Sequence, residues 1–287
     1  MKCEAALNCR TDVSTDFKAL TEALKTRASS MGCEFLTGSE VTGIEEKDRV
    51  IITLKSGEKI ESSFAINAAG GWSMDILHKM GIAEEYEDVH FRGQYWEVNQ
   101  NLASRNIYTV PRYPELPFLD PHWICRCDGR FEIGPNALPV ESPDAYDKSH
   151  SIGMLSKLME RPVMNKLRLL SNARFINLAA KEWGSSSKSG MVSRISEFIP
   201  GIKNSPVGKR GFSGIRSSVI DGNGAFVGEA MEFETPMTFH ITNYNSPGAT
   251  GAPAYAAFLV EKMEEKGILK LSGEKRGIWG IDEVTKG

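Results

Sequence analysis

The spacing of apolar residues changes along the chain, and each spacing predicts a different element. Residues 16–31 place apolar side chains at every third or fourth position, the pattern of one helix face, with Ser14 or Thr15 as the N-cap and Gly32 at the end. Shorter runs that alternate or are rich in β-branched residues predict strands at 33–37, 40–45, 49–55 and 59–65. We therefore expect a helix followed by an antiparallel meander.

A second pattern begins near residue 89. Residues 89–98 alternate like a half-buried strand, and Asp128-Gly129 joins two alternating runs into a predicted hairpin at 123–127 and 130–133. Helical spacing between prolines predicts helices over 150–160, 162–180 and 191–198. From residue 209 the pattern returns to strands and ends in a helix over 253–262. Strands followed by helices within one block predict a separate α+β domain.

Two predicted strands run into segments that almost lack side chains. Residues 63–67 lead into Ala-Ala-Gly-Gly at 68–71, and residues 240–243 lead into Ser-Pro-Gly-Ala-Thr at 246–250, ahead of the last helix. Such bends let a flat or anionic ligand touch main chain at a helix N-terminus. Strand ends in α/β sheets are also where nucleotide cofactors lie. Taken alone, the bend at 68–71 fits an ordinary turn without a ligand equally well, and the bend at 246–250 fits an ordinary turn better than a ligand site.

Composition and charge narrow the function classes. The chain has 287 residues, 41% of them hydrophobic, which suits one large domain or two interleaved ones. A net charge of −3 and a pI near 6.0 argue against a dedicated nucleic-acid surface. No apolar run approaches the roughly 20 residues of a transmembrane helix, and no signal peptide opens the sequence. We expect a cytoplasmic protein without a transmembrane segment.

The cysteines predict no metal site. There are five, and Cys125 and Cys127 would place two sulfurs on one face of a strand. A metal site would need further ligands nearby, and the sequence has no C-x-x-C pair, so reduced cysteines in a cytosolic sheet are the simpler interpretation.

Short segments spread over nearly the whole chain carry a family resemblance. They are Ala6-Leu7 with Asp16-Phe17, and residues 66–70, 91–95, 107–111, 117–119, 133–137, 188–190, 214–216 and 243 with 246–250. In these segments the chain resembles the D-amino-acid-oxidase-like superfamily of FAD-dependent oxidoreductases. Within it, the chain looks most like the L-2-hydroxyglutarate oxidases and dehydrogenases. Related enzymes of the superfamily handle glycine, sarcosine and glycerol 3-phosphate.

The resemblance implies a fold that combines α/β and α+β parts. A FAD/NAD(P)-binding Rossmann domain of the glutathione-reductase type is expected at 1–88 and 208–272, with an inserted antiparallel-sheet substrate domain at 89–207 and a tail at 273–287. The G-x-G-x-x-G turn that should open the first domain is absent. Gly222, Gly224 and Gly228 have the wrong spacing and predict a hairpin turn instead. We therefore expect a chain that lacks the first βαβ unit, about 30 residues or more.

FAD is the cofactor that the resemblance implies. Val41 is expected to meet the adenine region through its main chain, although alone it would be an ordinary core-facing strand valine. The two bends supply the other expected contacts, which are Ala68, Ala69, Gly70, Ser246, Pro247, Gly248, Ala249 and Thr250.

Oxidation of a 2-hydroxy acid needs a carboxylate clamp and a base for the hydroxyl proton. Arg216 is the predicted clamp, because a guanidinium makes two parallel bonds to a carboxylate; the alternative is a surface salt bridge. His240 is the predicted base, because a neutral imidazole suits that step near pH 7; the alternative is a core histidine. The remaining histidines carry less support, and they are His78, His90, His122 and His150.

Five further side chains are candidates for the same site. Arg92 and Tyr95 fall on opposite faces of a regular strand, unless Gly93 introduces a bulge that lets both reach the substrate. Arg92 would be a second cation for a dicarboxylate or a phosphate, or else a brace at the domain junction. The other candidates for substrate contacts are Tyr108, which ordinary aromatic packing also explains, Asn243 and Lys188.

The expected function is FAD-dependent oxidation of a small 2-hydroxy acid, with L-2-hydroxyglutarate favoured, by hydride transfer to the flavin. One alternative is a glycerol-3-phosphate dehydrogenase or an amino-acid or amine oxidase of the same superfamily. The other is a fragment without independent catalysis. Oxygen, a quinone and a flavoprotein partner are all open as electron acceptors, and a quinone would place the protein at a membrane surface.

Overall fold

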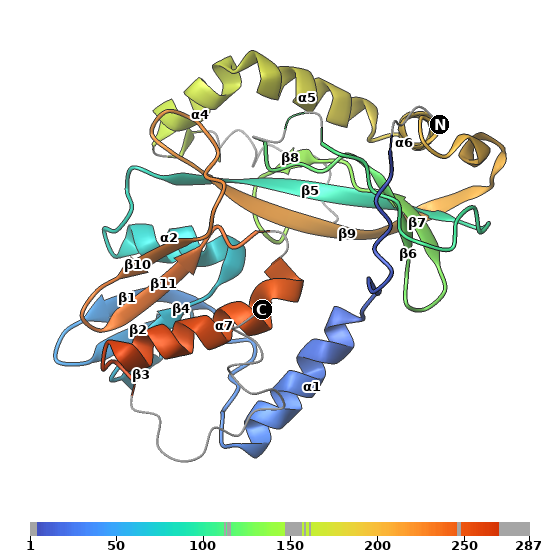
Figure 1. The fold of residues 1–287 in the computed structure, drawn as a ribbon. Helices are drawn as coiled ribbons and strands as arrows, with labels where there is room; N and C mark the ends of the chain where they lie inside the picture. The colour runs from blue at the N-terminus through green and yellow to red at the C-terminus, as the bar shows by residue number, and fades with distance from the viewer. Residues whose placement is uncertain are drawn as a thin grey trace. The chain divides into compact units, whose positions relative to one another are not determined.

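The computed structural model describes residues 5–111, 113, 116–146, 157, 159–160, 162–245 and 248–269. The chain divides into two compact units, Met1–Asn243 and Tyr244–Gly287. Figure 1 shows the course of the chain. The predicted helix at 150–160 and the tail at 273–287 lie mainly or wholly outside the described residues.

Helix α1, Phe17–Ser30, confirms the first predicted helix but not its cap. Asp16 is the N-cap, because its Oδ1 accepts hydrogen bonds from the backbone N–H groups of Lys18 and Ala19 at 3.0 Å. All residues of α1 are described, and none of them is buried. Phe17 and Leu24 are 38% and 44% exposed, so the apolar side of this helix has little cover within the described part of the chain.

A three-stranded antiparallel sheet follows the helix, in the order β1-β2-β3. Its strands are β1 Val41–Glu46, β2 Val50–Leu54 and β3 Lys59–Ser62, which confirms the predicted meander. Ile44 and Val50 form the buried side of this layer with Ala65 and Ile76. Residues 33–37 form no strand, because the short apolar run has no neighbouring strand with which to pair.

A second three-stranded sheet has the order β10-β11-β4 and contains the one parallel pairing among the described strands. Its strands are β4 Ala65–Asn67, β10 Met231–Glu234 and β11 Thr238–Thr242. After β4 the chain makes the 3-10 turn η1, Gly70–Trp72, and then the helix α2, Ser73–Lys79. The predicted passage from a strand through two glycines into a helix is therefore present.

The largest sheet contains five antiparallel strands and is built on two long ones. The long strand β5, Glu87–Val98, pairs over nearly its whole length with β9, Val207–Ile220, and the two lie side by side in Figure 1. The shorter strands β7 and β8 pair with successive parts of β5, and β6 pairs with β7. Their bounds are β6 His122–Cys125, β7 Phe131–Gly134 and β8 Leu138–Val140. The β6–β7 hairpin turns at Gly129 with φ +84°, as Asp-Gly predicted.

Helices cover one face of this sheet (Figure 1). They are α4 Val163–Ser171, α5 Ala173–Gly184 and α6 Lys188–Ile195, followed by the 3-10 turn η2 Pro200–Asn204. The single helix predicted over 162–180 is in fact two, because Asn172 leaves the helical conformation and caps α5 with its side chain. Met191 and Ile195 of α6 pack on Trp96, Trp123 and Ile133 of the sheet.

Strand β9 crosses the predicted domain boundary at residue 208. Its pairing with β5 places residues up to Ile220 in the antiparallel sheet, and only β10 and β11 join β4. Between these parts, Asp221 to Ala225 form a tight turn with Gly224 at φ +75°. This confirms the hairpin turn predicted at the glycines 222 and 224.

The second unit consists, in its described part, mainly of the helix α7, Gly248–Glu265. It begins five residues before the predicted start at 253, so Pro253 lies inside the helix, beyond its first turn. Tyr244 and Tyr255 stack within this unit, with ring centroids 4.6 Å apart.

Candidate functional site

The first bend leaves main chain uncovered at the end of β4. Ala68, Ala69 and Gly70 are exposed, and Gly70 has φ +59°, a conformation that side chains disfavour. Asn67 fixes the bend, because its Oδ1 accepts the N–H of Ala69 at 3.2 Å. A Cβ atom on Gly71 would lie 2.5 Å from Oγ of Ser217, so a side chain there is excluded. This exposed main chain fits a cofactor that needs close approach.

His240 lies in the middle of β11, opposite the last residue of β4, in a closed hydrogen-bond network. It pairs with Asn67 across the parallel strands and is fully buried. Its Nδ1 is 3.2 Å from Nδ2 of Asn67, and its Nε2 is 2.8 Å from Oγ1 of Thr238. Burial lowers the pKa of His240, so the ring is neutral as predicted. With both nitrogens engaged, however, this geometry favours the core-histidine alternative over a base that meets substrate.

Asn243 uses its side chain to hold the chain between β9 and β10. Its Oδ1 accepts the N–H of Val219 at 2.9 Å, and its Nδ2 donates to the carbonyls of Val227 and Glu229 at 2.8 and 2.7 Å. Its backbone has φ +55°, which Asn tolerates better than most residues. These contacts are structural, and they occupy the amide that was predicted to bind substrate.

Arg216 lies in β9 directly opposite Phe91 of β5. Its Nη1 donates to the carbonyl oxygen of Pro117, and burial lowers the pKa of the guanidinium from its very high ordinary value. The charge of Arg216 acts on the half-buried Tyr95, and so does the charge of Arg126. Burial nevertheless raises the pKa of Tyr95, which keeps the phenol protonated.

Tyr95, Tyr108, His122, Arg126 and Arg216 form a group that we call the sheet cluster. The guanidinium of Arg126 lies 5.2 Å from the ring centre of Tyr95 and pairs with the buried carboxylate of Glu132 at 2.5 Å. The rings of Tyr108 and His122 are 4.4 Å apart, and Arg126 also acts on His122. The structure therefore brings three predicted residues, Arg216, Tyr95 and Tyr108, into one neighbourhood.

Two members of the sheet cluster were missed by sequence reasoning. His122 was given little weight because it stands at the beginning of a hairpin strand, and Arg126 follows the same strand without a distinctive motif. Both residues belong to the predicted Asp-Gly hairpin, and this was the signal that could have found them. The pairing of β7 with β5 places the hairpin in the same sheet as the strand of Tyr95.

Arg92 and Lys188 make other contacts. Arg92 is 4% exposed, and its Nη1 donates to the carbonyls of Ala145 and Tyr146 at 3.1 and 3.4 Å, which agrees with the bracing alternative. The register shifts between β5 and β9 begin after Gln94, not at Gly93. Lys188 donates to the carbonyl of Val207 at 3.0 Å and lies 5.5 Å from the ring centre of Trp96.

Val41 is half-buried in β1 and packs against the apolar layer around Ile44. Its main-chain contact with adenine therefore stays a prediction. In the second bend, Ser246 and Pro247 lie outside the described residues, whereas Gly248, Ala249 and Thr250 form the first turn of α7. Ala249 and Thr250 are exposed, and their contact with FAD also stays a prediction.

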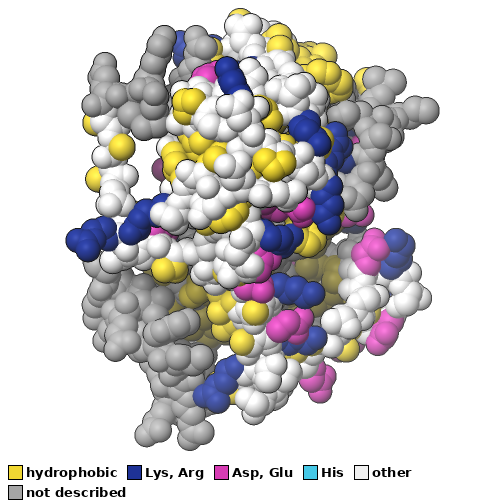
Figure 2. Space-filling model, turned by 90° about the vertical axis from the view of Figure 1, so that its right-hand side faces the viewer, with side chains coloured by type: hydrophobic (Ala, Val, Ile, Leu, Met, Phe, Trp, Pro, Cys, Tyr) yellow, Lys and Arg dark blue, Asp and Glu magenta, His cyan; other side chains and the backbone are white. Residues whose placement is uncertain are grey.

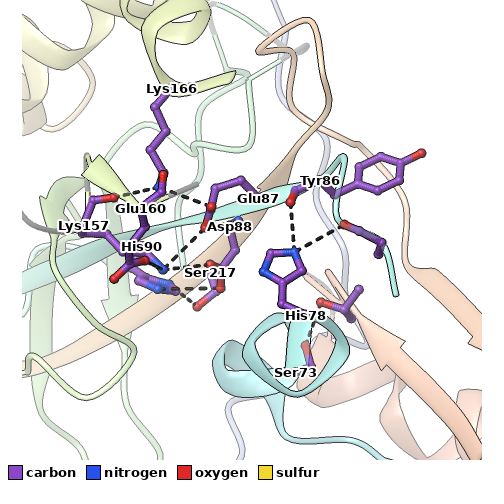
Figure 3. Close-up of polar contacts among 12 residues, drawn as sticks. Ser73, His78, Tyr86, Glu87, Asp88, His90, Lys157, Glu160, Lys166 and Ser217 are labelled. Atoms are coloured by element: carbon purple, nitrogen blue, oxygen red, sulfur yellow. Dashed lines mark hydrogen bonds and ion pairs between the residues drawn. The ribbon is translucent and has the colours of Figure 1, made fainter. Parts of the chain in front are cut away.

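A buried ionic cluster occupies the beginning of β5 (Figure 3). Glu87 pairs with Lys157 and Lys166 at 3.6 and 3.3 Å, and Asp88 lies 3.2 Å from Lys157. His90 bonds Oγ of Ser217 through Nδ1 at 2.8 Å and lies 3.6 Å from Asp88 through Nε2. These opposite charges compensate one another, and they link the sheet to α4 through Lys166 and to the segment before α4 through Lys157.

Two kinds of feature are absent from the described part of the chain. No group of His, Cys, Asp or Glu side chains among the described residues has the arrangement of a metal site. None of the helices in these ranges is long and apolar enough to span a bilayer. On the face drawn in Figure 2, cationic side chains lie next to anionic and hydrophobic ones, so this face has no continuous basic surface.

Solved structures define the class of the fold. L-alpha-glycerophosphate oxidase from Mycoplasma pneumoniae with FAD bound superposes with a TM-score of 0.59 at 18% identity, covering 89% of this chain and 57% of that one. Glycine oxidase from Geobacillus kaustophilus gives a TM-score of 0.56 at 15% identity, covering 89% and 55%. The fold is therefore that of FAD-binding oxidases and dehydrogenases, with mixed α/β and antiparallel parts.

The sequence comparisons give the family. Residues 2–262 match the family model of FAD dependent oxidoreductases, so the chain belongs to that family. L-2-hydroxyglutarate dehydrogenase of Escherichia coli K12 is 26% identical over 258 residues, which are 86% of this chain and 59% of that protein. The human mitochondrial L-2-hydroxyglutarate dehydrogenase is 24% identical over 282 residues, or 91% and 60%. The chain thus spans about 60% of the length of these relatives.

Proposed function

We propose that the protein takes part in FAD-dependent oxidation of a small 2-hydroxy acid, with L-2-hydroxyglutarate oxidised to 2-oxoglutarate as the favoured reaction. Family membership supports the cofactor, and curated relatives named L-2-hydroxyglutarate dehydrogenase support the substrate. FAD would supply the acceptor for the hydride. The exposed main chain of Ala68, Ala69 and Gly70 would contribute to its binding, because no side chain obstructs approach there.

The observation that carries this proposal is the sheet cluster. Arg126 and Arg216 place two positive charges near one phenol, Tyr95. Arg126 is paired with Glu132, and Arg216 donates to the backbone carbonyl of Pro117. A carboxylate bound by Arg216 would be fixed in orientation by two parallel hydrogen bonds.

Related reactions share these requirements. Glycerol 3-phosphate would also suit a site with two cations, and the structural similarity to a glycerophosphate oxidase is the specific observation in its favour. An amino acid would use the same carboxylate clamp but would need less help from a base. The electron acceptor, whether oxygen, a quinone or a flavoprotein, stays a prediction.

The first experiment is flavin uptake by the purified chain, followed by oxidation assays with an artificial electron acceptor. We expect bound flavin absorbance and preference for L-2-hydroxyglutarate over glycerol 3-phosphate and glycine. Arg216→Lys should raise KM by about tenfold or more, because lysine cannot form the bidentate pair. Arg210→Lys is the matched control in the same strand, since Arg210 is exposed and should leave KM unchanged.

The outcomes separate the candidate functions. Preference for glycerol 3-phosphate would replace the hydroxy-acid proposal by its nearest alternative. A colourless chain that takes up no added FAD would favour a fragment without independent catalysis. Equal KM values for Arg216→Lys and the parent chain would remove Arg216 from substrate binding.

A further inference from the structure

His122 has the geometry of a proton acceptor, and His240 does not. It is the first residue of β6 and is 6% exposed, with the ring of Tyr108 lying 4.4 Å from its own. Its Nδ1 is 3.0 Å from the carbonyl oxygen of Asp120. A carbonyl can only accept a hydrogen bond, so the neutral ring carries its proton on Nδ1 and presents a lone pair on Nε2. No described residue forms a hydrogen bond with that Nε2.

The charges around His122 keep it neutral and ready to accept a proton. Burial lowers its pKa, and the positive charge of Arg126 acts in the same direction. The hydrogen bond to the Asp120 carbonyl acts the other way and stabilises the cation that would form. The nearby carboxylate of Asp120 is paired with Lys181 and Arg194, at 3.2 and 2.5 Å. Glu132 is likewise paired with Arg126.

The other buried histidines lack a nitrogen of this kind. Both ring nitrogens of His240 have side-chain partners, Asn67 and Thr238. In His90, Nδ1 bonds Ser217 and Nε2 faces Asp88. A base in either position would first have to break an internal contact, whereas His122 lies against the ring of Tyr108 and within range of the charge of Arg126.

We propose that His122 is the catalytic base of this site, taking the hydroxyl proton of the substrate on Nε2 while Arg216 binds its carboxylate. The assignment rests on the proposed hydroxy-acid oxidation. In that step the O–H bond would break toward Nε2 and the C2–H bond would break with its electron pair, and bound FAD would supply the acceptor for that hydride. The C2–O bond becomes a double bond, and the imidazolium later releases its proton to solvent. The backbone carbonyl of Asp120 holds Nδ1–H throughout.

The tautomer can be tested without flavin or turnover. Nitrogen NMR of the imidazole rings in the purified chain, with His122→Gln to assign the resonance, should show His122 neutral at pH 7 with hydrogen on Nδ1. Addition of 2-hydroxyglutarate should shift that resonance, and the shift should be lost in Arg216→Lys. Hydrogen on Nε2, a charged ring at pH 7, or no response to a ligand that binds through Arg216 would overturn the proposal.

Kinetics provide the second test, in flavin-loaded enzyme. His122→Gln should lower kcat by about 100-fold or more with little change in KM, and it should remove the acid limb of the pH profile of kcat. His78→Gln is the matched control, because His78 lies on α2 outside the sheet cluster. A normal rate in His122→Gln would end the assignment. If the parent chain oxidises no 2-hydroxy acid, the proposed function fails, and the NMR response to ligand still decides whether His122 faces the site.

Discussion

His240 and His122 are both buried and both neutral, yet their surroundings prepare them for different tasks. His240 lies in the middle of its strand, inside a network in which Asn67 and Thr238 occupy both ring nitrogens. His122 begins its strand with one nitrogen tied to a backbone carbonyl and a tyrosine ring against its own. Burial alone therefore does not indicate a base. The hydrogen-bond partners of the two nitrogens distinguish a structural histidine from a reactive one.

The largest expected effect is on folding. His240→Ala should reduce the free energy of unfolding by about 3 kcal/mol, because it opens a cavity and removes partners from buried polar groups. His122→Ala should cost about 1 kcal/mol, mostly from the lost ring contact with Tyr108. Urea unfolding followed by circular dichroism measures both. Equal losses for the two variants would contradict the distinction between them.

Asn243→Ala should have the next largest effect, at about 2 kcal/mol. The substitution removes the hydrogen bonds to Val219, Val227 and Glu229 and leaves alanine at φ +55°, where a Cβ is unfavourable. Thermal unfolding measures the loss, and Asn223→Ala in the exposed turn serves as the control. If the Asn243→Ala variant kept its stability but had a raised KM, that result would support the predicted contact between Asn243 and the substrate.

Local sequence signals predicted the elements well where neighbouring residues decide them. The Asp128-Gly129 hairpin, the meander over β1 to β3 and the glycine bend after Asn67 all depend on turn residues next to alternating runs. Residues 33–37 show the limit of this approach, because a strand exists only when another strand pairs with it. The break at Asn172 was missed because one capping side chain outweighed a continuous helical pattern.

The site was only partly predictable for a related reason. The charge of Arg216 acts on Tyr95 because the pairing of β5 with β9 puts Arg216 opposite Phe91, four residues before Tyr95 in the same strand. Spacing along the chain does not reveal this pairing. His240 was preferred to His122 because it precedes a bend, which is a property of sequence position. The partners that occupy its nitrogens come from residues 173 positions away and from within its own strand, and only the folded chain reveals both.

A smaller effect is expected in the pH dependence of the free energy of unfolding, to which the same buried histidines contribute. Burial lowers the pKa of His240, His122 and His90 below the ordinary value of about 6.5. The unfolded chain therefore binds more protons below that pH, and stability contributed by the neutral rings is present above pH 6.5 and lost as the pH falls. Urea midpoints at pH 7.0 and 5.5 should show this loss, and His240→Gln and His122→Gln should each reduce it. A chain equally stable at both values would contradict the buried neutral state of these rings.

The smallest expected effects distinguish a packing role of the Tyr108 ring from a substrate contact made by its hydroxyl. If Tyr108 serves by covering His122, Tyr108→Phe should leave both stability and KM almost unchanged, because the ring contact at 4.4 Å is kept. Tyr108→Leu should then cost about 0.5–1 kcal/mol of stability, which is the usual contribution of an aromatic pair. If the hydroxyl instead bonds the substrate, as the sequence suggested, Tyr108→Phe should raise KM about tenfold with no loss of stability. Measuring unfolding and KM on the same two variants decides between a residue that shapes the base and one that holds the substrate.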